Sequence, residues 1–174
     1  MLLAREYLLK EENEEAIKEY LACLDYEEIY QPINKLVLLE TYGRLGDLYY
    51  WSMHDFEKSL YYFNQFIKLD NSYREPYFCL GEIYANEGMY SMAINMINEG
   101  LKQSKRHYDW VERKDFWIAK ADELLLDIYF VLHDYDNAKM YAKNAYQHNP
   151  NNNKIAFKYI TILENLLEMI EENN

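Results

Sequence analysis

A pattern of small and aromatic residues recurs at intervals of about 34 residues, and it constrains the fold more than any other feature. Residues 46–49 read Gly-Asp-Leu-Tyr, and residues 81–84 read Gly-Glu-Ile-Tyr. Each stretch is followed by a small residue, Ser59 in one copy and Ala93 in the next, 34 residues apart. Related copies begin at residues 3 and 125, and the same position of the four copies holds Tyr7, Tyr49, Tyr84 and Tyr129. A period of this length indicates a two-helix unit that stacks on its neighbours.

One copy carries the fullest set of recurring residues. They are Tyr77, Leu80, Gly81, Tyr84, Gly88, Tyr90, Ala93, Ile97, Gly100 and Leu101. This set resembles the signature of the tetratricopeptide repeat. The resemblance implies an all-α fold, a right-handed superhelix (α-solenoid) of about four antiparallel helix pairs plus a C-terminal capping helix. Physical reasoning agrees, because small residues let paired helices approach closely while large apolar residues fill the surrounding space.

Turn and capping residues divide the chain into nine expected helices within a single domain, residues 1–174. The expected helices span 1–11, 14–25, 33–51, 55–69, 73–87, 90–103, 110–132, 135–147 and 152–171. The repeats are expected at about residues 1–28, 33–70, 73–105 and 110–150, with the capping helix at 152–171. Residues 149–153 read Asn-Pro-Asn-Asn-Asn, which ends one helix and caps the next.

The repeat is irregular in three places. The turn at residues 51–55 has one residue more than the family pattern, and about eleven extra residues fall at 103–114. The first copy begins inside a repeat, so we expect the chain to be an excised piece of a longer protein. Its apolar residues Leu2, Leu3, Tyr7 and Leu8 are then expected to pair two copies into a homodimer.

The charge balance excludes several classes of partner. Lys and Arg number 18 against 30 Asp and Glu, giving a net charge of -12, which argues against nucleic acid as the main partner. The sequence contains neither a long apolar run nor a signal peptide, so we expect no membrane association. Cys23 and Cys79 lack metal-binding or redox spacing and fit buried, reduced thiols in a cytoplasmic protein.

The sequence does not suggest an enzyme. The four histidines fall at turns or helix ends without metal-ligand spacing, and no Gly-rich phosphate loop is present. Residues 134–136 read Asp-Tyr-Asp, a string that also occurs in nucleotide-sugar transferases, but here it occupies an expected turn between repeat helices. We therefore predict no catalytic residue, no metal and no cofactor.

The resemblance implies a concave groove lined by the first helix of each pair. Carried over residue by residue, the candidate peptide-binding residues are Asp47, Tyr50, Trp51, Phe78, Glu82, Asn86, Glu123, Asp127 and Phe130. The same face is expected to include Glu40, Glu75, Ala85, Lys120 and Val131. An acidic, aromatic groove favours a protein or peptide partner with cationic or aromatic segments. The alternative is that these residues are only the polar edge of the helices.

The acidic residues also argue against one known role of such repeats. In the chaperone-binding subtype, Lys and Asn grip the carboxylate at the end of a peptide. Here the matching positions hold Asp47, Glu82 and Asp127, which would repel that ligand.

A second resemblance covers about residues 72–148. Residues 74–77 (Arg-Glu-Pro-Tyr), Trp117, residues 122–125 (Asp-Glu-Leu-Leu), Tyr129 and residues 133–135 (His-Asp-Tyr) look like the repeat tail of bacterial family 2 glycosyltransferases. This implies a non-catalytic accessory scaffold whose catalytic domain would lie elsewhere in a parent protein. The alternative is a free-standing adaptor or peptide-sensing regulator.

Overall fold

The computed structural model describes residues 2–29, 34–103 and 116–172, and these residues form nine helices. Their bounds are α1 Leu2–Leu9, α2 Asn13–Ile29, α3 Lys35–Trp51, α4 Phe56–Leu69, α5 Glu75–Asn86, α6 Tyr90–Lys102, α7 Phe116–Val131, α8 Tyr135–His148 and α9 Asn153–Glu172. Most ends lie within two residues of the predicted ones, although α2 runs four residues further than expected. The predicted helix start at 110 and most of the predicted insertion at 103–114 lie outside the described residues.

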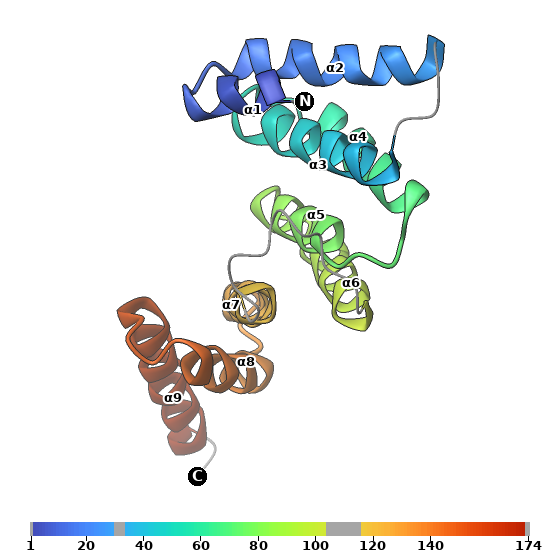
Figure 1. The fold of residues 1–174 in the computed structure, drawn as a ribbon. Helices are drawn as coiled ribbons and strands as arrows, with labels where there is room; N and C mark the ends of the chain where they lie inside the picture. The colour runs from blue at the N-terminus through green and yellow to red at the C-terminus, as the bar shows by residue number, and fades with distance from the viewer. Residues whose placement is uncertain (1, 30–33, 104–115, 173–174) are drawn as a thin grey trace.

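The helices form hairpins that stack in sequence order, so the two ends of the chain lie at opposite ends of the stack (Figure 1). Each odd-numbered helix from α1 to α7 packs most extensively on the even-numbered helix that follows it. In addition, α5 contacts both α3 and α7, so the odd-numbered helices form an inner layer. This is the α-solenoid of antiparallel helix pairs predicted from the repeat.

Small residues sit where paired helices cross, as predicted. A side chain at Gly46 would place its Cβ 2.7 Å from the Phe63 ring of α4, and one at Gly81 would lie 2.6 Å from Ile97 of α6. The Ser59 hydroxyl donates a buried hydrogen bond of 2.8 Å to the Gly46 carbonyl. These close approaches hold the α3–α4 and α5–α6 hairpins together.

The recurring tyrosines mark equivalent turns. In each of the four hairpins the residue just before the second helix donates its backbone N–H to the carbonyl of this tyrosine, at 2.7 to 3.0 Å. The donor lies five residues after Tyr7, Tyr84 and Tyr129, but six residues after Tyr49. The extra residue predicted for the α3–α4 turn is therefore confirmed.

The two ends of the solenoid expose apolar side chains. Leu2 and Leu3 are exposed, whereas Tyr7 and Leu8 pack partly against the first core cluster. Helix α9 buries Ile155 and Ile162 against α8, yet Phe157 on its other face is 71% exposed. Within the described ranges, no helix is both long enough and apolar enough to cross a membrane.

Candidate functional site

Side-chain bonds link the inner helices at the positions predicted for the groove. At the N-terminal end, Arg5 of α1 donates from Nε and Nη2 to both carboxylate oxygens of Glu40 on α3, at 2.7 and 2.5 Å. Glu40 is 2% exposed, so this residue lies beneath the expected groove surface. The bidentate geometry fixes the position of α1 against α3.

Two further acids of the predicted groove are paired in the same way. Lys120 of α7 donates to Glu82 of α5 at 2.6 Å, and Lys158 of α9 donates to Asp127 of α7. Each acid is thus neutralised by a base from the next inner helix. Part of the acidic charge predicted for this face is therefore used to join the helices.

Asp47 on α3 is half-buried, unlike the exposed Asp127 at the same repeat position. Burial raises the pKa of this carboxyl to about 7, Arg44 acts in the opposite direction, and the nearby Glu82 raises it further. At neutral pH Asp47 is therefore only partly ionised.

Phe78 lies in the core instead of on the groove. It is 1% exposed and packs in a cluster with Ile97 and Leu125. A Cβ on Gly100 would lie 2.7 Å from the Phe78 ring, so the missing side chain of this glycine provides the space that the ring fills. Glu75, expected on the same face, is also fully buried.

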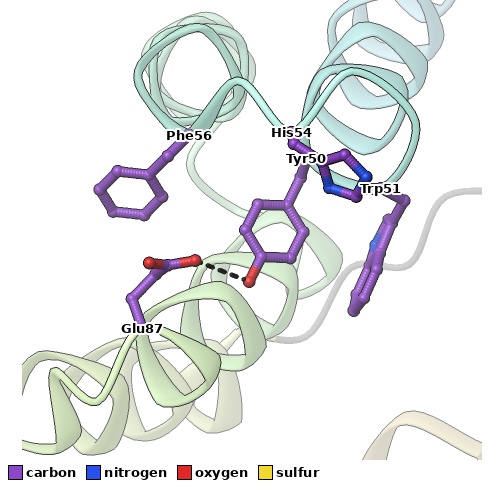
Figure 2. A pocket seen from close by; sticks show the side chains of 5 residues that line it. All are labelled: Tyr50, Trp51, His54, Phe56 and Glu87. Atoms are coloured by element: carbon purple, nitrogen blue, oxygen red, sulfur yellow. Dashed lines mark hydrogen bonds between the residues drawn. The ribbon is translucent and has the colours of Figure 1, made fainter.

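The end of α3 and the turn that follows it form a pocket of about 180 Å³. Its lining residues are Tyr50, Trp51, His54, Phe56 and Glu87. Figure 2 shows the Glu87 carboxylate at the Tyr50 hydroxyl, with Phe56 on one side of the tyrosine and Trp51 and His54 on the other. The structure thus brings together two predicted groove residues, Tyr50 and Trp51, with three that sequence reasoning missed.

Tyr50 is the centre of this pocket. Its hydroxyl donates to Oε1 of Glu87 at 3.1 Å, which joins α3 to the C-cap residue of α5. Its ring meets the Trp51 ring edge to face, with centroids 4.8 Å apart. Partial burial raises the pKa of Tyr50, and a hydrogen bond with the predicted groove residue Asn86 acts in the other direction. Trp51 itself is 54% exposed.

The remaining predicted groove residues lie further along the inner layer. Glu123 is half-buried on α7, and Phe130 packs edge to face on Tyr135 with centroids 6.4 Å apart. Phe130 belongs to the cluster that α7, α8 and α9 share, so it is not part of the pocket at Trp51.

The described residues contain no cluster of three or more His, Cys, Asp or Glu side chains placed to hold a metal ion. Cys23 and Cys79 are free thiols. Burial raises the pKa of the Cys79 thiol well above its usual range, which disfavours the reactive thiolate.

Comparisons with known proteins agree with the fold. Residues 39–73 match the tetratricopeptide repeat family. The whole structure is similar to the crystal structure of MamA, with a TM-score of 0.62 and 16% sequence identity over 98% of each chain. At that identity the similarity shows the fold alone, and the predicted tetratricopeptide-type solenoid is confirmed. A comparison with curated proteins gave no match.

Proposed function

We propose that this chain is a non-catalytic scaffold that binds a segment of a protein or peptide along its inner helices. The observation that carries the proposal is the exposed Trp51 ring, which lies beside Tyr50 in a pocket on the predicted face. Aromatic side chains of this kind supply large contact areas at low entropic cost and dominate many interfaces.

The proposed binding surface begins at the α3–α4 pocket and continues across α5 and α7. Its residues are Asp47, Tyr50, Trp51, Glu82, Asn86, Glu87, Glu123, Asp127 and Phe130, without the buried Phe78. The ion pairs that use Glu82 and Asp127 hold the layer together, so these two residues contribute to the shape of the surface as well as to its charge. We propose a partner segment with cationic or aromatic side chains.

Selection of binders from a random peptide library would test this proposal. The dissociation constants of the selected peptides are measured by calorimetry for the wild type and for Trp51→Ala. Truncation of a central aromatic anchor is expected to weaken binding at least tenfold. Tyr61→Ala is the matched control, because Tyr61 is 56% exposed on the even-numbered helix α4. Peptides that tolerate Trp51→Ala but not Tyr61→Ala would contradict the proposed surface.

The origin of the chain separates two versions of this function. The resemblance of residues 72–148 to glycosyltransferase tails favours an accessory domain of a larger enzyme, whereas the alternative is a free-standing adaptor. The gene sequence directly upstream of Met1 distinguishes them: a fused catalytic domain supports the first, and a stop codon followed by a ribosome-binding site supports the second. The two free thiols fit a cytoplasmic location for either version.

We also propose that the first hairpin can join two copies of the chain. Leu2 is 80% exposed and Leu3 is 45% exposed on α1, so both are available to a second copy. Light scattering over a range of concentrations tests this, with Leu2→Gln/Leu3→Gln expected to shift the mass toward the monomer. A wild-type monomer at every concentration would remove this part of the proposal.

A further inference from the structure

The pocket at the α3–α4 turn combines aromatic rings with one carboxylate. Tyr50 and Trp51 end α3, Phe56 begins α4, and the intervening turn supplies His54, while Glu87 reaches in from α5 (Figure 2). Aromatic faces carry a negative quadrupole that attracts cations, and a nearby carboxylate adds a full negative charge. Among the residues that the structure describes, neither Lys nor Arg lines this pocket. Its chemistry is therefore suited to a positive charge.

We infer that this pocket binds the guanidinium group of an arginine side chain on the partner segment, an inference that rests on the proposed function. Its volume of about 180 Å³ is below the range of about 300–1,000 Å³ typical of pockets for whole small molecules. A pocket of this size accommodates the head of a single side chain. Arginine thus serves as the anchor that places the partner on the inner helices.

The geometry favours guanidinium over a simple ammonium group. Tyr50 donates to only one oxygen of Glu87, and a carboxylate accepts several hydrogen bonds, so acceptor sites remain for an N–H fork. Trp51 offers an exposed indole face at the rim, on which a planar cation can stack.

Glu87 is positioned for this role by the local fold. It is exposed, it follows the last residue of α5, and its backbone N–H bonds back to the Ile83 carbonyl at 3.0 Å. The hydrogen bond from Tyr50 then holds the carboxylate at the pocket. The carboxylate is therefore aimed before a ligand arrives, which reduces the entropic cost of binding.

The test uses blocked amino acids as probes with the full chain at pH 8. Nα-acetyl-arginine methylamide is titrated while backbone amide shifts are followed by NMR. The lysine and citrulline analogues are the ligand controls, since citrulline has the shape of arginine without its charge. We expect saturable shifts around Trp51 and Glu87 with arginine, at least fivefold weaker binding of lysine, and no saturation with citrulline.

Glu87→Gln is the matched protein variant, because a glutamine carbonyl can still accept from Tyr50. It is expected to weaken arginine binding at least fivefold, whereas Glu164→Gln, at an exposed position of α9 away from the pocket, leaves it unchanged. Equal binding of arginine and citrulline, equal binding of lysine, or an unaffected Glu87→Gln variant would each overturn the inference. If arginine fails while Trp51→Ala still weakens the selected peptides, the inference is wrong and the proposed function stands.

Discussion

The hairpins α3–α4 and α7–α8 have similar turns, but a pocket lies at the first turn and a contact between a histidine and a tyrosine lies in the second. Each turn places a histidine at positive φ, His54 at 54° and His133 at 58°, and each is followed by an aspartate that caps the next helix. In the second turn Tyr135 contacts His133, with its hydroxyl 2.9 Å from Nδ1. Phe56 replaces this tyrosine in the first turn and has no hydroxyl. The α3–α4 turn therefore differs from the α7–α8 turn by one extra residue and by Phe56 in place of tyrosine, and it is the turn at which the pocket lies.

The interiors of the two hairpins differ in a complementary way. Gly46 of α3 faces Phe63 of α4. The matching positions of the α7–α8 hairpin hold Leu126 and Ala142, which are both fully buried in one cluster. In both hairpins a small residue packs against a large one. The small residue lies on the first helix of α3–α4 but on the second helix of α7–α8. The repeat therefore requires a combined volume at this crossing, and it does not require a glycine at a fixed position.

The largest expected effect comes from exchanging these volumes. Gly46→Leu forces a side chain into the Phe63 ring and is expected to lower the free energy of unfolding by about 3 kcal/mol. Gly46→Leu/Phe63→Ala reproduces the arrangement of α7–α8 and should regain at least half of the loss. Urea unfolding of both variants measures this. A single variant as stable as the wild type would show that the crossing is not tightly packed.

A smaller effect on stability is expected for Asp47, which occupies the same repeat position as Asp127. Ionising the half-buried Asp47, whose pKa is about 7, costs stability as pH rises from about 4 to 7, because an unfolded aspartate ionises near 3.9. Asp47→Asn removes this cost, so it should have little effect at pH 4 but stabilise by roughly 1–2 kcal/mol at pH 8, after allowance for water around the group. Unfolding free energies at the two pH values measure the difference.

Asp127→Asn is the control for this prediction. Asp127 is exposed and paired with Lys158, so its substitution should change stability by a similar small amount at both pH values. An Asp47→Asn effect that is the same at pH 4 and pH 8 would contradict the burial of this carboxyl.

The next effect concerns the N-cap of α8 in the α7–α8 turn. Asp134 accepts from the backbone N–H of Asn137 at 3.2 Å and from its side-chain amide at 2.8 Å. Asp134→Ala is expected to cost about 1 kcal/mol of unfolding free energy, the usual value for a lost N-cap. Asp136→Ala, in the first turn of the same helix, is the control and should cost clearly less. Equal losses in thermal or urea unfolding would show that the charge, and not the cap, stabilises α8.

The smallest expected effect is the difference in stability between glycine substitutions at His54 and at His133. His54→Gly relieves a left-handed backbone that favours glycine and should stabilise by about 0.5 kcal/mol. His133→Gly gains the same relief but loses the hydrogen bond with Tyr135, so we expect a net change near zero or slightly destabilising. Parallel urea titrations compare them. Equal stabilisation of both variants would mean that the His133–Tyr135 contact contributes nothing.

The fold could be predicted from the sequence because the residues that define each helix hairpin lie close together in the chain. Small residues at a fixed spacing located the helix crossings, and the alignment around Tyr49 revealed the extra residue of the α3–α4 turn. The repeat position of Phe78 predicts a groove residue, but its ring is buried in the space that Gly100 of α6 leaves. That space depends on packing between helices, which the repeat pattern does not show. Glu87 was missed for a similar reason, since only the stacking of α5 on α3 brings it to Tyr50. The pairing of Glu82 with Lys120 likewise spans two repeats.

The central claim, that a partner segment lies on the inner helices at the α3–α4 turn, is tested most directly by the fluorescence of Trp51 alone. The chain has three tryptophans, at 51, 110 and 117, so Trp110→Phe/Trp117→Phe leaves Trp51 as the only reporter. Acrylamide quenching of this variant is measured with and without a library-selected peptide at a concentration that calorimetry shows to be saturating. We predict that the peptide shifts the emission and reduces quenching at least twofold, because it covers the exposed ring. Unchanged emission and quenching while the peptide is bound would contradict the account.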